Sequence, residues 1–153
     1  MKLYPDRKTA EPRITFEIIE DVISEVVSVK HAKDFLQIDF DDWDWLIELL
    51  IKSSREESEK FTGLSIGVRK IKFSGDYQNE SAYMPFAPIT EKAGDLQTVG
   101  YTSATCPAAI KLAILRMVHT HFEFRNDIEK SGVAMLDINA QTILKPFRRR
   151  VGI

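Results

Sequence analysis

The stretch Pro107–Asn126, PAAIKLAILRMVHTHFEFRN, decides the fold of this chain. Proline is tolerated in the first turn of a helix, because the N–H that it lacks would have no partner there. Residues at intervals of three and four share one face of an α-helix, and here they are Ile110, Ala113, Ile114, Met117, Val118 and His121. The spacing therefore predicts a long helix with one side in a hydrophobic core.

A second long helix is predicted upstream, from Asp41 to Phe61. Asp41 or Asp42 is suited to cap its first turn, since a carboxylate accepts hydrogen bonds from free backbone N–H groups, and Gly63 is a typical stop signal. The residues on its core face are Trp43, Leu46, Ile47, Leu50, Ile51, Ser54, Ser58 and Phe61. Trp45 lies off that face, which predicts an exposed tryptophan.

Two shorter helices flank the long ones. Ser28 is a good N-cap for a helix over Val29–Gln37. Asn139 is suited to cap a last helix that runs to Lys145, and Pro146 ends it, because proline cannot continue a helix. We expect the segment after Pro146 to leave the fold as a basic tail that is disordered until it docks on a partner.

A different pattern lies between the long helices. Apolar residues from Leu64 to Tyr101 come in short runs interrupted by glycines and prolines, as in strands joined by turns. Residues 14–27 fit two types of structure, because those from Ile14 to Ile18 alternate as in a strand and those from Ile18 to Val26 fit a short helix. The predicted fold is mainly α, in the α+β class, with two long antiparallel helices, shorter flanking helices, and a small antiparallel β-hairpin or sheet inserted between the long ones.

Length and charge narrow the functional classes. A chain of 153 residues fits one domain. Its net charge of -2 is unevenly spread, because residues 17–44 carry nine carboxylates against two lysines, whereas the chain closes with Lys145-Pro146-Phe147-Arg148-Arg149-Arg150. An acidic early region and a basic end favour head-to-tail contacts between copies. No run approaches the ~20 apolar residues of a membrane span, so we expect no membrane partner.

Catalytic and metal-binding signals are weak. The acidic run Asp39–Asp44 lacks the glycine and glutamate that an EF-hand requires at the sixth and twelfth loop positions. His119 and His121 point about 200° apart around a helix, so they cannot bind one metal from the same face. Cys106 lies at a helix start, which favours a thiolate, yet no motif supplies a base for it. We therefore expect no enzyme activity, no cofactor and no metal.

Five segments then follow one another in a specific order. They are an early helix with an acidic turn and a long helix, the stop of that long helix, a proline-bracketed strand, the opening of the last long helix, and a closing basic segment. In this chain they are Val27–Ile51, Phe61-Thr62-Gly63, Met84–Ile89, Pro107–Lys111 and Leu144–Arg149. Together they resemble the tailed-phage head-tail connector family, whose members are also called adaptor or head-completion proteins.

The resemblance implies a structural protein. In such a family about twelve copies form a ring beneath the portal of a filled phage head, closed by rotational symmetry. The ring extends the channel for the genomic DNA and provides the platform for the tail or stopper protein. The chain would then comprise an N-terminal arm (1–26), a connector domain (27–150) and a basic C-terminal tail (146–153). Its location would be the head-tail interface of the virion, after assembly in the host cytoplasm.

Charge and exposure suggest which residues make these contacts. For the portal or the DNA we expect Phe147, Arg148, Arg149 and Arg150. For the interface between subunits we expect Asp41, Asp42, Trp45 and His119. The alternative function is a DNA-binding packaging accessory protein that acts through the basic tail. A metal- or thiol-dependent enzyme is a third class, which would need a bound metal or a reactive Cys106.

Overall fold

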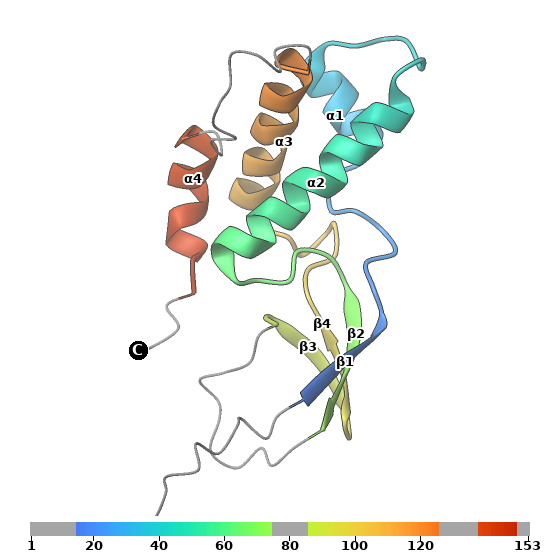
Figure 1. Ribbon diagram of the computed structural model, residues 1–153, viewed down its shortest axis with the longest axis vertical. Helices are drawn as coiled ribbons and strands as arrows, with labels where there is room; N and C mark the ends of the chain where they lie inside the picture. The colour runs from blue at the N-terminus through green and yellow to red at the C-terminus, as the bar shows by residue number, and fades with distance from the viewer. Residues whose placement is uncertain (1–14, 75–85, 126–137, 150–153) are drawn as a thin grey trace, which may run out of the picture.

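The computed structural model describes residues 15–74, 86–125 and 138–149, and it divides into a helical body and a small sheet (Figure 1). The helical body contains α1 (Val29–Leu36), α2 (Asp44–Thr62), α3 (Ala108–Glu123), α4 (Ile138–Leu144) and a 3₁₀ turn (Lys145–Phe147). The sheet, which we call the wing, contains β1 (Thr15–Glu20), β2 (Arg69–Ser74), β3 (Ile89–Ala93) and β4 (Leu96–Val99). The predicted α+β class is confirmed.

The two long helices form the centre of the body. They run in opposite directions and pack against each other, with α1 on one side and α4 on the other (Figure 1). The face predicted for α3 is buried, and the buried residues of both helices meet in one cluster that includes Ile47, Ile51, Ile110, Ala113, Ile114, Met117, Val118 and Phe122. The apolar spacing of the sequence thus predicted the core of the body correctly.

The ends of the helices were predicted with mixed success. Ser28 caps α1, since its hydroxyl accepts a hydrogen bond from the His31 backbone N–H at 3.2 Å. Gly63 ends α2 with φ 72°, in the left-handed region that favours glycine. The prediction that Asp41 or Asp42 caps α2 is wrong, because the helix begins only at Asp44 and no side chain caps it.

The C-terminal helix also differs from its prediction. Asn139 does not precede α4 but lies in its first turn, since the helix begins at Ile138. Pro146 ends the α-helix as expected, yet the chain continues in the 3₁₀ turn and stays on the body. Proline is compatible with this turn, because it occupies one of the first positions, where no backbone N–H is needed.

The wing is a four-stranded antiparallel sheet in the order β1-β2-β4-β3. Residues 15–20, where strand and helix both fitted the sequence, form the edge strand β1. Its Phe16 lies opposite Phe73 and its Ile18 opposite Ile71 in the register with β2. The start of the proline-bracketed segment, residues 84–85, and residues 1–14 of the predicted arm lie outside the described residues. The small antiparallel sheet predicted between the long helices in the sequence is confirmed for β2, β3 and β4, whereas β1 joins it from the segment before α1.

The hydrophobic core has two separate parts. The larger one fills the body, whereas the smaller one belongs to the wing and consists of Ile71, Phe73 and Val99, with Phe86 and Ile89 packed against it. Among the described elements, the substantial packing contacts join helix to helix or strand to strand. The segments that connect the two parts are anchored in the core of the body by Val26, Ile66 and Cys106, whereas no described residue belongs to both cores.

Candidate functional site: assembly surfaces and a buried charge network

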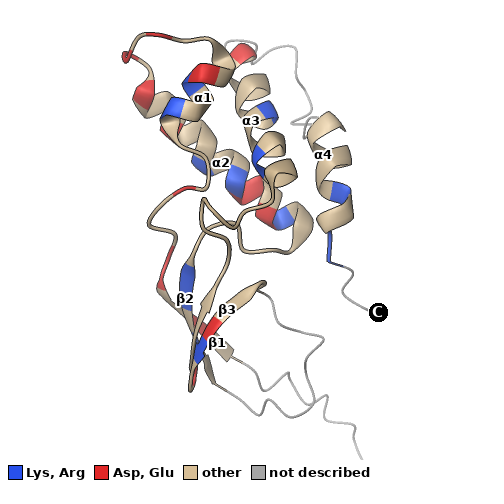
Figure 2. Cartoon of the chain, turned by 180° about the vertical axis from the view of Figure 1, so that it is seen from behind, with Lys and Arg blue, Asp and Glu red and all other residues tan. Residues whose placement is uncertain are grey.

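The acidic residues predicted at a subunit interface lie on the connection between α1 and α2. Carboxylates gather there, whereas basic residues come in the segment directly after α4 (Figure 2). Asp41 and Asp42 are both exposed. Asp41 forms an ion pair with Lys33, which also contacts Asp44 at 2.9 Å. The hydrogen bond to Asp41, followed by that to Asp44, raises the pKa of Lys33. Asp42 forms no ion pair with any described residue and contributes negative charge to the surface.

Trp45 is exposed, as predicted, on the outer face of α2. Its side chain is 67% exposed, and Leu49, one helical turn further on, is exposed as well. Glu48 lies beside them and is also exposed. These residues, together with Asp41 and Asp42, form an apolar ridge with an acidic border, which we call the ridge surface.

His119 lies on a different surface. Its ring contacts Phe35 of α1 edge-on, with ring centroids 6.2 Å apart. Leu112 and Arg116 are exposed on the same side of α3, two turns and one turn before His119, respectively. We call Phe35, Leu112, Arg116 and His119 the α3 surface. His121 instead lies half-buried, with its Nε2 3.6 Å from a carboxylate oxygen of Glu57.

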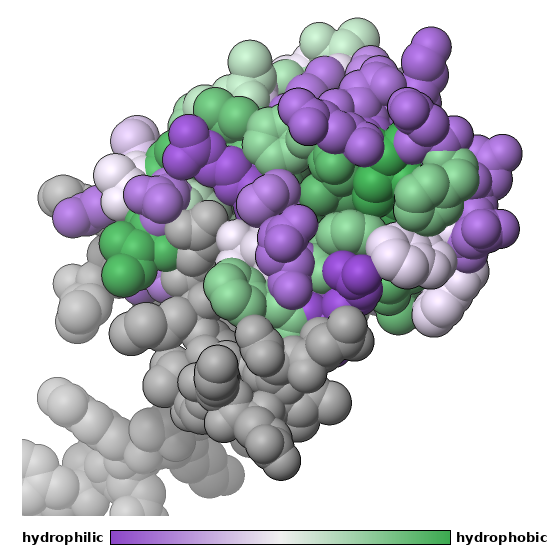
Figure 3. All heavy atoms as spheres, turned by 90° about the horizontal axis from the view of Figure 1, so that it is seen from above, coloured by the Kyte–Doolittle hydropathy of each residue, from purple (hydrophilic) through white to green (hydrophobic). Residues whose placement is uncertain are grey.

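An aromatic stack fixes the α1–α2 connection to the end of α3. Phe40 contacts Trp43 at a centroid distance of 5.4 Å, and Trp43 contacts Phe122 at 5.2 Å. The Arg125 guanidinium lies 4.4 Å from the Trp43 ring and 4.3 Å from the Phe122 ring. Seen from this end, apolar surface lies between hydrophilic side chains (Figure 3). The stack holds the acidic connection in a defined place rather than leaving it as a free loop.

The basic C-terminal residues are attached to the body, so the expectation of a tail that leaves the fold at Pro146 is wrong for residues 147–149. Phe147 packs against the core of the body. Arg148 lies over the Phe61 ring, 5.4 Å from its centroid. The Arg149 backbone N–H donates to the carbonyl of Thr62 at 2.8 Å. This docking has no local signal in the sequence, because the Thr62 carbonyl at the end of α2 accepts its hydrogen bond from a distant segment. Arg150 lies outside the described residues.

Cys106 is a poor candidate for a nucleophile. The residue is buried at the start of α3, and burial raises the pKa of its thiol to about 11. At neutral pH the group is therefore a thiol and not the reactive thiolate. Within the described residues there is no group of three or more histidine, cysteine or carboxylate side chains arranged to hold a metal ion. None of the described helices is long and apolar enough to span a bilayer.

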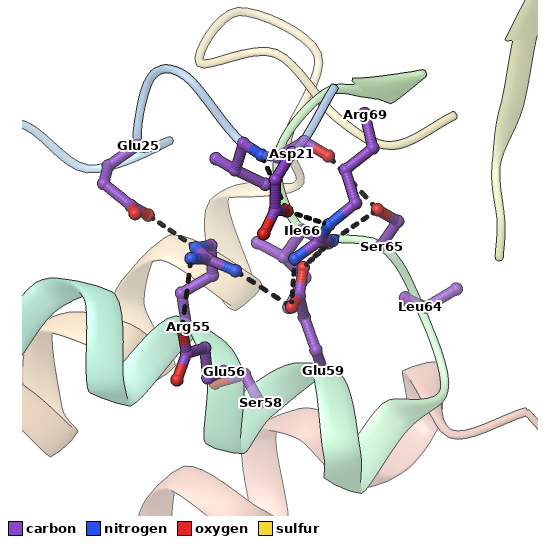
Figure 4. Close-up of polar contacts among 12 residues, drawn as sticks. Asp21, Glu25, Arg55, Glu56, Ser58, Glu59, Leu64, Ser65, Ile66 and Arg69 are labelled. Carbon is purple, nitrogen blue, oxygen red and sulfur yellow. Dashed lines mark hydrogen bonds and ion pairs between the residues drawn. The ribbon is translucent and has the colours of Figure 1, made fainter. Parts of the chain in front are cut away.

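A cluster of charged side chains joins the wing to the body, and we call it the joint network (Figure 4). Glu59 of α2 accepts hydrogen bonds from two arginines: from Arg55 Nη1 at 2.9 Å, and from Arg69 Nη1 and Nη2 at 2.6 and 2.9 Å. Arg55 Nε also contacts Glu25 at 2.8 Å, and Arg69 Nε contacts Asp21 at 2.7 Å. Five charged side chains thus alternate in sign along one continuous chain of contacts.

Burial makes the joint network unusual. Arg55 and Arg69 are 3% and 8% exposed, although arginine is rarely buried without partners. Burial would lower the pKa of Arg69, but the hydrogen bonds and charge of Glu59 outweigh it, so that its pKa is raised. Sequence analysis missed the network. A usable signal was present, because Arg55 occupies a core position of α2, one turn after Ile51 and one turn before Glu59.

Two distinct exposed surfaces on one helical body are typical of a subunit that contacts other proteins. The chain belongs to the family of phage gp6-like head-tail connector proteins, which matches residues 26–149. This family is one of structural phage connectors, which confirms the resemblance inferred from the sequence motifs. No curated protein matches the chain.

Two solved chains of similar fold come from gene transfer agent particles. A chain in the virion of a native gene transfer agent (GTA) particle has a TM-score of 0.66 and 12% identity, covering 87% of this chain and 94% of that one. A chain in the neck of an empty GTA particle, computed with C6 symmetry, has a TM-score of 0.65 and 10% identity, covering 88% and 95%. Bacteriophage HK97 gp6 has 17% identity with a TM-score of 0.49, covering 81% and 94%. At these identities the likeness concerns the fold.

Proposed function

We propose that this chain is a subunit of a ring that assembles beneath the portal of a phage or prophage head. The ring would contain about twelve copies related by rotational symmetry, extend the DNA channel, and provide the platform for the tail or stopper protein. Membership of the connector family supports this proposal. A similar chain in a particle neck is consistent with it. The protein would act in the virion, at the head-tail interface, after assembly in the host cytoplasm, and without enzyme activity.

The observation that carries the proposal is the difference between the two exposed surfaces. The ridge surface is bordered by carboxylates, including Asp42 and Glu48, whereas the α3 surface contains Arg116 and His119. A two-fold dimer would place each surface against its own copy, and the ridge surface would then meet like charge. A heterologous contact instead places acidic ridge against basic α3 surface. Repetition of such a contact closes a ring when the rotation between copies allows it.

The basic C-terminal segment would face a partner outside the ring. Lys145 and Arg148 are exposed, and Arg149 follows directly. Their attachment to the body fixes the position of this charge relative to the two ring surfaces. We infer that residues 147–150 contact the portal, whose templating would strengthen weak contacts between subunits through multivalency. Channel DNA is the other candidate partner of the same residues.

Native mass measurement and electron microscopy test the ring. The chain is mixed with purified portal, and we expect a collar of added density that is absent from portal alone. Trp45→Ala should abolish the collar, because it removes the largest apolar group of the ridge surface. Ile138→Ala is the matched control, since Ile138 is 65% exposed on α4, outside both surfaces.

A charge exchange makes the test specific. Glu48→Arg should weaken the ring, and Arg116→Glu in the same chain should restore part of it if the two surfaces face each other. An equal loss with Trp45→Ala and Ile138→Ala would contradict the proposed interface. If no concentration of chain and portal gives a complex, and the monomer instead binds DNA with strong salt dependence, the accessory DNA-binding function would replace the connector ring.

A further inference from the structure

The chain passes between the wing and the body three times, and the first two of these passages contribute Asp21, Glu25 and Ser65 to the joint network. Residues 21–28 lead from β1 to α1, residues 63–68 from α2 to β2, and residues 100–107 from β4 to α3. The views of the ribbon show the wing beyond one end of the body, with these passages between them (Figure 1). The orientation of the wing therefore depends on a small number of contacts in this region.

Glu59 is the central contact of the joint network. It lies in the last turns of α2, and its carboxylate reaches Arg69 at the start of β2 and Arg55 one turn earlier on α2. Its Oε1 also accepts the backbone N–H of Ile66, at 2.7 Å, in the passage from α2 to β2. The Ser65 hydroxyl oxygen accepts a further hydrogen bond from Arg69 Nη1 at 2.8 Å. One carboxylate thus connects the body, the passage from α2 to β2, and Arg69, the first residue of β2.

The outer members of the joint network connect the first passage. Asp21 binds Arg69 and Glu25 binds Arg55, so both arginines are held from two sides (Figure 4). The whole set contains two positive and three negative groups. Removing the charge of Glu59 would leave Arg69 with Asp21 alone, and Arg55 with Glu25 and the more distant Glu56. Buried charges that lose a partner are strongly destabilising, and they draw water into the site.

A close backbone contact completes the joint. Gly100 has φ +100°, and a Cβ there would lie 1.9 Å from the Gly67 carbonyl oxygen. Gly67 has φ +116°, and its own Cβ would lie 2.8 Å from Val22. The three passages are therefore in van der Waals contact. This contact brings them together but has no charge or direction that would select one wing orientation.

We propose that Glu59 is the positioning residue that sets the orientation of the wing relative to the helical body. The joint network then makes two separately packed cores act as one rigid subunit. The proposal does not depend on ring formation, since it concerns the isolated chain. Its consequence for assembly is that the wing and the two body surfaces keep a fixed mutual arrangement.

Distance measurements between spin labels test the proposal directly. Labels at Lys92→Cys on β3 and Glu123→Cys at the end of α3 report the distance between wing and body, in a Cys106→Ala background. Both labelled residues are exposed. For the parent chain we expect one narrow distance distribution. Glu59→Gln should replace it with a broad one, while the helical circular dichroism signal stays the same.

Two controls separate orientation from general loss of charge. Glu56→Gln removes a neighbouring, more exposed carboxylate, 3.7 Å from Arg55, and should leave the narrow distribution unchanged. Arg69→Met removes only the wing side of the network and should broaden the distribution even if Glu59→Gln fails to fold. Its matched control is Lys70→Met, since Lys70 pairs with Glu20 inside the wing.

The outcomes decide the matter. A broad distribution with Glu59→Gln, or with Arg69→Met where Glu59→Gln does not fold, together with narrow distributions in both controls, would support Glu59 as the positioning residue. A narrow distribution retained in Arg69→Met and in folded Glu59→Gln would overturn the proposal and assign the wing orientation to the glycine contact. Equal broadening by Glu56→Gln would overturn it too, because any nearby loss of charge would then have the same effect.

Discussion

Deletion of Phe147–Ile153 should destabilise the body, although the sequence alone predicts a dispensable tail. Three contacts are lost. Half-burial of Phe147 contributes roughly 1 kcal/mol, about half the value of a fully buried phenylalanine. The hydrogen bond from Arg149 to Thr62 contributes about 0.5–1.5 kcal/mol. The contact of Arg148 with the Phe61 ring adds about 0.5–1 kcal/mol.

Together these contacts amount to about 2–4 kcal/mol, which for a chain of this length lowers Tm by roughly 5–12 °C. Thermal unfolding followed by circular dichroism and urea unfolding at fixed temperature both measure the loss. Deletion of residues 150–153 is the control, because it removes none of the three contacts. An unchanged Tm for the longer deletion would refute the reasoning. A large loss also means that portal binding should be tested with Arg148→Gln and Arg149→Gln instead of a truncation.

Three further outcomes are expected. Ile114→Ala should lower the free energy of unfolding by about 3–5 kcal/mol, because Ile114 is fully buried between the long helices. In the same urea titration, Leu49→Ala on the exposed face should change the free energy of unfolding by less than about 0.5 kcal/mol. Cys106 should not react with a thiol reagent at pH 7 until denaturant exposes it, since its pKa is raised to about 11. A backbone hydrogen bond from Val22 and the side chain of Arg69 lower the pKa of Asp21, so its contribution to stability is present above the ordinary pKa of 3.8 and is lost as the pH falls below that value. The difference in unfolding free energy between the parent and Asp21→Asn should therefore shrink between pH 7 and pH 3. A difference that stays constant would mean that Asp21 does not contribute to the joint network.

The sequence predicted those parts of the fold that depend on local periodicity. The core face of α3 and the exposed Trp45 follow from the 3.6-residue repeat alone. Ser28 and Gly63 were found because capping residues act within their own turn. The predicted cap in the connection between α1 and α2 was wrong, since Asp41 pairs with Lys33 of the preceding helix instead of capping α2. Capping propensity does not show which of two available partners a carboxylate binds.

The joint network could not be predicted for a related reason. Arg55 and Arg69 are charged residues in buried positions, and their partners lie up to 48 residues away in the chain. Single-sequence reasoning treats such residues as exposed, because unpaired charges are costly to bury. Only the fold brings the carboxylates of Asp21, Glu25 and Glu59 close enough to reverse that expectation. The docking of residues 147–149 on the end of α2 escaped prediction for the same reason.

The order β1-β2-β4-β3 has a consequence for folding and for dissection of the protein. Strand β1 is made first, yet its neighbour β2 follows only after both α1 and α2. Neither part of the molecule is a continuous piece of chain, so no single cut separates them. Strand β1 can pair with β2 only after α1 and α2 have been made, and contacts of such long sequence separation form slowly. A shortened chain that starts at residue 26, where the family match begins, would keep the helices but leave β2 as a new, unpaired edge, where another chain could add a strand.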